Sequence, residues 1–372
     1  MRKVGFRLVM AVALGIASVA RGGHEFPIYP SYYPHLISIA TITPDRAATE
    51  LVAGRIQAYV GAQPAFAGAI PEAIKPIESL GGLVVVRVNP DSARAKDLAG
   101  SCMLVDSVMR DIEGHASAFT FHPYPITPFD GDYLYHADLA EAARARIGNL
   151  PDPVASPPRI RASEALAHAV PDLPRANGDA WDVAIDEVDA DALVASSTKV
   201  AEGTIEPPWR RSAWYRTLLL LEPAIDDANR ATRVRADVAR LTSGIATEVE
   251  RINAERELVS LLTQGCRAAV AGYTVKREYV NADYSAGIEN IGFDSIAGLD
   301  SPIFIRTAKL KDFPWNGILS LGVASEPTAA WNPIAGFTDP FGRLMWSAIG
   351  DAAIMPSPNG PGFVLNRTSD VQ

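Results

Sequence analysis

The sequence has little cysteine and lacks the short motifs that mark the commonest enzymes. Its 372 residues include two cysteines and six histidines. They contain no GxSxG, GxxxxGK[ST], HExxH, GxGxxG or CxxC motif. These absences argue against lipase-type, P-loop, zincin-type and dinucleotide-binding chemistry, and against thioredoxin-type or c-type haem sites. An enzyme whose site is assembled from distant residues remains compatible with the sequence.

Positive charge is also in deficit. There are 34 Lys and Arg residues against 43 Asp and Glu, which gives a formal net charge of −9. An acidic chain repels phosphate backbones and anionic lipids, so neither nucleic acid nor a membrane surface is an expected partner. Hydrophobic residues make up 48% of the chain, which is enough for packed cores. After residue 20, no apolar run is long enough to cross a bilayer.

The first twenty residues have the pattern of a secretory signal peptide. Three cations precede an apolar run over residues 8–17, and Ser18 and Ala20 stand at the −3 and −1 positions of a cleavage site. We therefore expect cleavage after about Ala20 and a periplasmic location. Because the leader carries three cations and no acid, the mature chain would have a net charge of −12.

Export bears on the two cysteines, Cys102 and Cys266. Outside the reducing cytoplasm a lone pair of cysteines favours a disulfide, and we predict that these two residues form one. The alternative is two buried free thiols, each acting as a small hydrophobic side chain.

Apolar strands alternate with helices in the first part of the chain. This alternation predicts an α/β lobe with a mostly parallel sheet. The expected elements are a strand at 37–42, a helix at 44–56, a strand at 56–60, a helix at 71–80 and a strand at 83–88.

A proline-rich stretch divides the chain into three mature segments. We expect an α/β lobe over 21–150, a linker over 151–180, and a helix-rich α+β second domain over 181–372 with an irregular C-terminal region. Apolar residues that recur every seven positions from Ala231 to Cys266 predict one long helix over 224–270. That helix either packs on its own domain or forms a dimeric coiled coil.

A family resemblance covers residues 37–107. It rests on a Gly-x-Ile-Gln-Ala step at 54–58, an apolar strand that ends at Arg87, an Asp-Ser pair at 91–92 and an Asp-Leu-x-Gly step at 97–100. This segment resembles the first lobe of periplasmic solute-binding proteins of the phosphate/phosphonate type. The resemblance implies a hinged two-lobe protein that closes on a small solute. The chain departs from the family at Gln57, where Asp is common, and in having no clear serine-rich turn after residue 107.

Two clusters of aromatic and histidine residues are candidate contacts for such a solute. The candidate ligand-binding residues are Tyr32, Tyr33, His35, His122, Tyr124 and His136. The first three alternatively form a surface arm. The last three lie in a loop over 118–139 that alternatively is a hydrogen-bonded structural loop or, with its carboxylates, a site for a divalent metal.

Three functions follow in order of preference. The first is an exported solute-binding protein that takes a small solute, with anions among the candidates, and delivers it to a membrane transporter. The second is an accessory protein that assembles with another exported protein through the long helix and the aromatic C-terminal region. The third is a metal-dependent exported enzyme. The preferred hypothesis requires no cofactor and no catalytic residue.

Overall fold

The computed structural model describes most of the chain after residue 33. The described residues are 34–113, 118–150, 156–163, 166–167, 174–176, 178, 180–196, 207–245, 247–311, 317–326, 340–349 and 353–365. The predicted signal peptide, Tyr32 and Tyr33 lie outside them.

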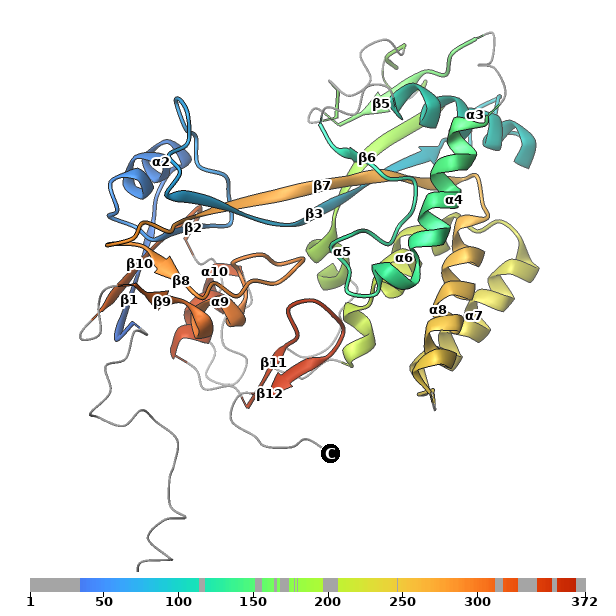
Figure 1. Ribbon diagram of the computed structural model, residues 1–372. Coiled ribbons are helices and arrows are strands. Elements are labelled where there is room, and N and C mark those ends of the chain that lie inside the picture. Colours follow the sequence, from blue (N-terminus) through green and yellow to red (C-terminus); the bar gives the residue numbers. More distant parts are fainter. Residues whose placement is uncertain are drawn as a thin grey trace, which may run out of the picture.

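An eight-stranded sheet runs through the molecule (Figure 1). Its strand order is β1-β10-β2-β7-β3-β6-β5, and β4 pairs with β7 beside this path. The strands of this sheet are β1 (Leu36–Thr41), β2 (Ala58–Val60), β3 (Ile74–Val88), β4 (Thr120–Phe121), β5 (Ile160–Ala162), β6 (Val183–Asp189), β7 (Ala268–Asn281) and β10 (Ile318–Val323). Two small sheets pair β8 (Ile288–Glu289) with β9 (Lys309–Leu310), and β11 (Ile354–Pro356) with β12 (Phe363–Leu365).

Helices flank this sheet, so the predicted mixed α/β class is confirmed. The α-helices are α2 (Pro44–Val52), α3 (Leu98–Glu113), α4 (Ala137–Gly148), α5 (Ala190–Ser196), α6 (Ala213–Leu221), α7 (Ala228–Thr242), α8 (Glu248–Thr263), α9 (Pro302–Thr307) and α10 (Pro340–Ile349). Short 3-10 turns are η1 (Tyr133–Tyr135), η3 (Pro208–Arg211) and η4 (Glu222–Ala224). Within the described part of the chain, none of the helices has both the length and the apolarity to cross a membrane.

Strand direction changes across the sheet. The pairs β1–β10, β10–β2 and β5–β6 are parallel, so the expected parallel character is found at the two ends. In the middle, β2–β7, β7–β3 and β3–β6 are antiparallel. The central pair consists of the two long strands β3 and β7, which lie side by side in opposite directions.

Two predicted helices are corrected. The helix expected over 71–80 is instead the first half of β3, which pairs with β7 from Ile74 to Arg87. Its register shifts between Leu80 and Gly82. The prediction was wrong because this sheet pairing overrides a weak local pattern, and because Pro76 disfavours the interior of a helix.

The single long helix expected over 224–270 was also wrong: α7 and α8 are two helices that pack against each other. Gly244, at φ +90°, lies in the turn between them. Each helix has its own N-cap: the side chain of Asp227 accepts from the backbone N–H of Arg230, and that of Thr247 accepts from the backbone N–H of Glu250. A continuous coiled-coil seam is therefore absent from this pair.

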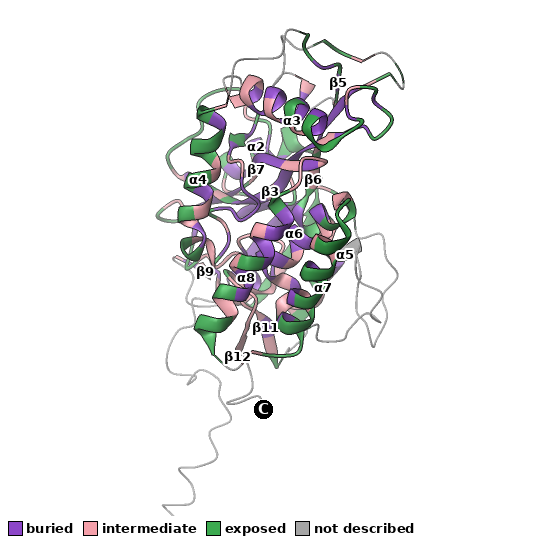
Figure 2. Cartoon of the chain, turned by 90° about the vertical axis from the view of Figure 1, so that its right-hand side faces the viewer, coloured by how far each residue is buried: buried purple, intermediate pink, exposed green. Residues whose placement is uncertain are grey.

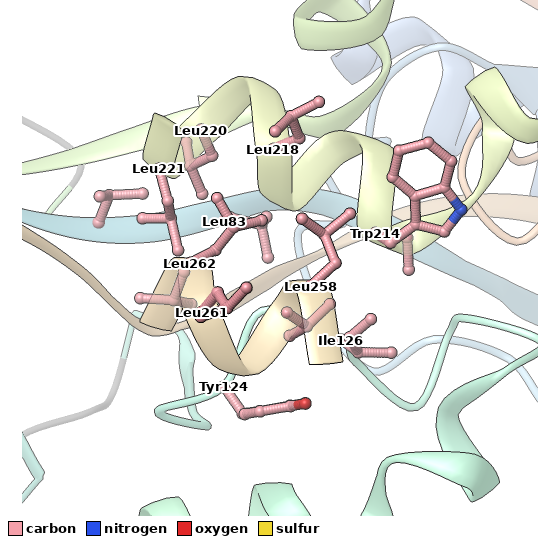
Figure 3. Packing of buried hydrophobic residues seen from close by; sticks show 14 of the residues in the cluster. Leu83, Tyr124, Ile126, Trp214, Leu218, Leu220, Leu221, Leu258, Leu261 and Leu262 are labelled. Atoms are coloured by element: carbon pink, nitrogen blue, oxygen red, sulfur yellow. The ribbon is translucent and has the colours of Figure 1, made fainter. Parts of the chain in front are cut away.

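Buried side chains divide the molecule into two lobes. We call residues 80–275 the central lobe and residues 34–77 with 279–365 the terminal lobe. Each has its own hydrophobic clusters, and β3 and β7 supply residues to both. In the central lobe, leucines of α6 and α8 meet across Leu83 of β3 (Figure 3). Figure 2 shows the result: α6 is largely buried, whereas α7 turns mostly exposed residues outward.

The predicted division of the chain at 151–180 does not divide the sheet. Within that stretch, β5 pairs with β6. The sheet also places strands that precede residue 151 beside strands that follow residue 180: β1 pairs with β10, and β3 pairs with both β6 and β7. The central lobe is thus inserted between two segments of the terminal lobe.

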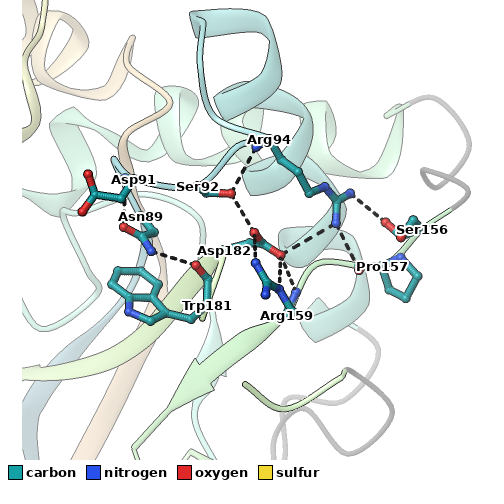
Figure 4. Close-up of polar contacts among 9 residues, drawn as sticks. All are labelled: Asn89, Asp91, Ser92, Arg94, Ser156, Pro157, Arg159, Trp181 and Asp182. Atoms are coloured by element: carbon teal, nitrogen blue, oxygen red, sulfur yellow. Dashed lines mark hydrogen bonds and ion pairs between the residues drawn. The ribbon is translucent and has the colours of Figure 1, made fainter. Parts of the chain in front are cut away.

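An ion-paired carboxylate fixes the far edge of the central lobe (Figure 4). Asp182 is 2% exposed and accepts a hydrogen bond from Ser92 Oγ at 2.6 Å. Arg159 donates to it from Nε and Nη2, both at 3.1 Å. Burial alone would raise the pKa of Asp182, but the hydrogen bonds from Arg159 and Ser92 outweigh it and hold the pKa below its usual value. These contacts tie the start of β6 to the loop after β3 and to the segment before β5.

The predicted disulfide is confirmed. Cys102 of α3 is bonded to Cys266, which lies between α8 and β7, with an S–S distance of 1.98 Å. The two residues are 164 positions apart, and both belong to the central lobe. The bond therefore holds α3 against the strand that forms the middle of the sheet.

A buried glutamate ties three segments together where the lobes meet. Glu278 of β7 is fully buried, and its carboxylate accepts hydrogen bonds from the backbone N–H of Gly61 and of Leu299, both at 2.6 Å. Gly298 passes so close that a Cβ on it would overlap the Glu278 carboxylate, and its φ of +72° also favours glycine.

We predict that replacing both cysteines, Cys102→Ala with Cys266→Ala, lowers the free energy of unfolding by about 3–5 kcal/mol, because a long loop of the unfolded chain is released. Denaturant unfolding of the oxidised protein measures this difference. A reductant should lower the stability of the wild type and leave the double variant unchanged; an unaffected wild type would contradict the prediction.

We predict that Glu278→Gln lowers the free energy of unfolding by about 1–3 kcal/mol, because an amide NH₂ then faces a backbone N–H donor. The matched control is Glu78→Gln on the neighbouring strand, whose ion pair with Arg277 is half exposed at both ends. That control should cost less than about 1 kcal/mol. Equal losses in the two variants would count against the assigned role of Glu278.

Candidate functional site

The structure does not bring the two predicted clusters together. Tyr32 and Tyr33 lie outside the described residues. His35 is exposed at the start of β1, where its backbone N–H donates to Gly317 O at 3.0 Å. The loop that holds the other three candidates lies in the central lobe, whereas β1 lies at the outer end of the terminal lobe (Figure 1).

Two of those three residues form a buried pair. The Tyr124 hydroxyl and His136 Nδ1 are 2.9 Å apart, and the residues are 4% and 0% exposed. Burial raises the pKa of Tyr124 and lowers the pKa of His136 to about 4. Both side chains are therefore neutral at neutral pH. Figure 3 shows Tyr124 beside Ile126, packed under α8.

His122 also faces the core. Its Nε2 lies 2.8 Å from Ile126 O, and its ring packs against Tyr273 with centroids 5.7 Å apart. Burial lowers its pKa. In this arrangement His122, Tyr124 and His136 hold the loop to the core, as in the structural alternative that the sequence left open.

The metal alternative for the 118–139 loop finds no support in the described residues, which contain no group of three or more His, Cys, Asp or Glu side chains placed to hold a metal ion. Two of the loop's carboxylates are instead paired with arginines. Asp130 pairs with the buried Arg216, and Asp138 pairs with Arg256 at 2.8 Å.

A polar notch lies where the two lobes meet, and we call it the inter-lobe notch. Its cavity volume is about 20 Å³, which is room for about one water molecule. The central lobe contributes the loop after β4 and the start of α6, and the terminal lobe contributes the 295–296 loop and the β11–β12 turn. The lining residues are Asp130, Gly131, Asp132, Arg211, Ser212, Ala213, Ser295, Ile296, Asn359, Gly360 and Pro361.

A buried ion pair fixes the central-lobe wall of the notch. Asp130 Oδ2 accepts hydrogen bonds from the backbone N–H of Thr127 at 2.8 Å and from its hydroxyl at 3.0 Å. Asp130 Oδ1 accepts from Arg216 Nη2 of α6. The two charged side chains are 4% and 1% exposed, so the loop is held firmly on the helix.

Asp132 differs from the other acids of this wall. It is half-buried, and no cationic side chain of the described residues lies within ion-pair distance of it. Burial raises its pKa to about 7, and the nearby charges of Asp130 and Glu255 act in the same direction. A carboxyl group that titrates near neutrality and faces a notch is a candidate functional group.

An ion pair crosses the notch. Arg211, the last residue of η3, donates to Asp294 Oδ2 at 2.5 Å and to the carbonyl oxygen of Ser357 at 3.0 Å. Asp294 Oδ1 in turn accepts from the backbone N–H of Ile296 at 2.9 Å and of Ala297 at 3.0 Å. Arg211 therefore connects the central lobe to two separate segments of the terminal lobe.

Sequence reasoning missed this site because its parts are far apart in the chain. Asp130 and Asp132 were noted as carboxylates of the 118–139 loop, but Arg211 and the 294–298 loop carried no recognisable motif. The Pro- and Gly-rich turn over 357–362 was a usable signal for a tight turn, although it gave no indication of where the turn would dock.

Comparison with known proteins gives no family assignment. No protein-family model matches the chain. No curated protein matches it either.

Solved structures give fold-level likenesses at low TM-scores. The binding protein AgaA of A. tumefaciens R10, in complex with agropinic acid, is 15% identical, with 72% of this chain and 59% of that chain covered and a TM-score of 0.38. The oligopeptide-binding protein AppA of Bacillus subtilis, in complex with a nonapeptide, is 11% identical, with 72% and 58% covered and a TM-score of 0.38. The open, unliganded periplasmic murein tripeptide binding protein MppA is 15% identical, with 72% and 55% covered and a TM-score of 0.40.

The chain spans less than two thirds of the length of each of these proteins. With identities of 15% or less and TM-scores below 0.5, these likenesses assign no ligand and no function to this chain.

Proposed function

We propose that this chain is an exported two-lobe binding protein whose lobes enclose a small solute at the inter-lobe notch. The observation that carries the proposal is the origin of the notch walls: one comes from the central lobe and the other from the terminal lobe. Each lobe has hydrophobic clusters of its own, although Ile296 of the terminal lobe packs against a central-lobe cluster, so the two lobes can move relative to one another with little loss of core packing.

The size of the notch indicates a closed form. About 20 Å³ accommodates a water molecule, so a solute enters only if the lobes separate. The shared strands offer a place to bend, because the register of β3 against β7 shifts between Leu80 and Gly82. Gly81 lies at this shift, and a Cβ on it would stand 2.8 Å from Thr274 Oγ1. A side chain at this position would obstruct the close approach of the strands.

The charges of the notch favour one kind of solute. Asp130 is neutralised by Arg216, and Arg211 by Asp294, whereas Asp132 has no cationic partner among the described residues. An ammonium group or another hydrogen-bond donor would complement Asp132. This lining favours a donor-bearing solute over the anionic one that the sequence resemblance implies.

A membrane transporter is the proposed partner, since an exported binder of this kind delivers its solute to the membrane. The predicted leader supports export into the periplasm. The alternative of an assembly protein loses its main support, because the long helix on which it rested is the pair α7 and α8 within the central lobe. Among the described residues, no arrangement of side chains supports the third alternative, a metal-dependent enzyme.

The first test is a thermal-shift screen with amino acids, di- and tripeptides, putrescine, phosphate, sulfate and divalent metals. We expect an amine-bearing solute to raise the melting temperature; a ligand at one hundred times its Kd stabilises by about 2.7 kcal/mol. The variant Asp294→Asn removes the ion pair across the notch while an amide oxygen still accepts from the 296–297 backbone, so we expect faster solute binding.

The matched control for Asp294→Asn is Glu78→Gln, which removes an exposed ion pair that does not cross the notch. It should bind solute at the wild-type rate. No shift with any solute, in the wild type and in Asp294→Asn alike, would sink the proposal. A shift with phosphate or sulfate alone would overturn the preference for a donor-bearing solute.

The second test uses the pKa of Asp132. The folded protein keeps this proton up to about pH 7, whereas the unfolded chain loses it near 3.8, so folding becomes less favourable as the pH rises through this range. We expect Asp132→Asn to relieve this cost, so its melting temperature relative to the wild type should increase from pH 4 to pH 8.

Asp138→Asn is the control for that measurement. Its hydrogen bonds with Arg256 hold the pKa of Asp138 at about 2, so its charge contributes stability that is lost only as the pH falls. Asp138→Asn should therefore show no gain at pH 8. Melting curves of Asp132→Asn that parallel the wild type at every pH would show that Asp132 is not a strained carboxylate.

A further inference from the structure

The β11–β12 hairpin lies between the two lobes. Figure 1 shows it below the long strands β3 and β7, with α9 and α10 on one side and the helices of the central lobe on the other. Its strands pair antiparallel from Ile354 with Leu365 to Pro356 with Phe363. The backbone N–H of Ser357 donates to Gly362 O at 2.9 Å and closes the turn.

Three consecutive carbonyls of this turn contact residues that line the inter-lobe notch. The carbonyl oxygen of Ser357 accepts from Arg211 Nη1 at 3.0 Å, and that of Pro358 accepts from the backbone N–H of Ser295 at 2.8 Å. The carbonyl oxygen of Asn359 lies against Gly131, where an added Cβ would overlap it. The turn is therefore in contact with the central lobe and with the terminal lobe at once.

The hairpin makes these contacts with its main chain. Arg211 and the Ser295 amide supply donors, and the hairpin supplies carbonyl oxygens; no hairpin side chain is needed for either bond. A peptide in a turn conformation can present consecutive carbonyl oxygens in the same way, whereas successive carbonyls of an extended strand point to opposite sides. The unpaired Asp132 in the same notch would complement the amide N–H or ammonium groups of such a segment.

The hairpin also accounts for the small volume of the notch. Asn359, Gly360 and Pro361 form part of its lining, so the cavity of about 20 Å³ is what remains beside them. With the turn withdrawn, the groups that it satisfies, Arg211 Nη1 and the Ser295 N–H, would be open to another acceptor.

We propose that the turn of the β11–β12 hairpin is an intramolecular occupant of the solute site, and that the ligand it stands in for is a peptide segment in a turn conformation. This inference rests on the proposed function and adds to it the class of ligand and an internal competitor. A peptide enters when the hairpin withdraws, and its carbonyl oxygens take the places of those of Ser357 and Pro358.

One side chain offers a way to release the hairpin without altering the notch. Met355 of β11 is 6% exposed, and β11 packs against α9. It is absent from the residues that line the notch. A charge at this position would be buried without a partner, which disfavours the docked hairpin. Leu365, on the opposite strand of the same hairpin, is 50% exposed and provides a matched control.

The experiment compares full-length Met355→Asp, Leu365→Asp and wild type by amide hydrogen exchange. The reporter is the Ser295 N–H, which is hydrogen-bonded to Pro358 O in the docked state. We expect at least tenfold faster exchange in Met355→Asp and wild-type exchange in Leu365→Asp. The probe is a synthetic peptide with the sequence of residues 353–365; it should bind Met355→Asp and restore protection at Ser295, and bind neither the wild type nor Leu365→Asp.

Met355→Ala is a milder variant that serves if Met355→Asp fails to fold. It should show the same changes in exchange and peptide binding, with a smaller magnitude. Unchanged Ser295 exchange in both Met355 variants, when both are folded, would overturn the docked state. Equal binding of the peptide to wild type and Met355→Asp would overturn occupancy by the hairpin and leave the proposed function standing. If Met355→Asp releases the hairpin but binds neither the peptide nor any solute of the thermal-shift screen, the proposed function itself fails.

Discussion

The pairing of β3 with β7 is the contact on which the rest of the molecule depends. These two strands are 15 and 14 residues long, and they supply buried side chains to the clusters of both lobes. Near the boundary between the lobes their register shifts, and the two small residues Gly81 and Gly82 lie at this shift. The same pair of strands therefore makes one sheet of the two lobes and allows the lobes to remain distinct.

Most buried carboxylates of the described residues are held by ion pairs or hydrogen bonds, with Asp237 of α7 among the exceptions. Asp130 and Asp182 are each paired with an arginine, and Glu278 accepts from two backbone N–H groups. Such groups specify how segments meet, because leaving any one of them unpaired costs free energy. Asp132 forms no ion pair with the described residues, although the charge of Arg216 acts to lower its pKa, and it lies beside a notch that both lobes form. An acid in that place adds little to the stability of the fold, and the proposed donor-bearing solute would complement it.

Local patterns predicted the local elements well. The helix expected at 44–56 is α2, the strand expected at 83–88 lies within β3, and the two cysteines are bonded. The failures have physical causes. Sheet pairing turned the expected helix at 71–80 into a strand, and a glycine at positive φ split the heptad pattern into α7 and α8.

The site was harder to predict than the elements. The loop around His122 and His136 was identified, yet its histidines face the core, and the acids between them face the notch. Arg211, Ser295 and the hairpin turn come from three further segments. Their meeting depends on how the two long strands place the lobes, which no spacing along the chain expresses.

The insertion of the central lobe has a consequence for the order in which the chain acquires structure. Residues 80–275 are contiguous, so this lobe has all of its strands and its disulfide partners once residue 281 has emerged. The sheet of the terminal lobe is completed later, because β1 and β2 both pair with β10, whose residues 318–323 come almost 280 positions after β1. A chain that crosses a membrane N-terminus first would leave β1 unpaired during that interval, together with the edge of β2 that does not pair with β7. The strand that emerges first would thus be among the last to be paired. A chaperone that binds exposed strand edges would act on it first.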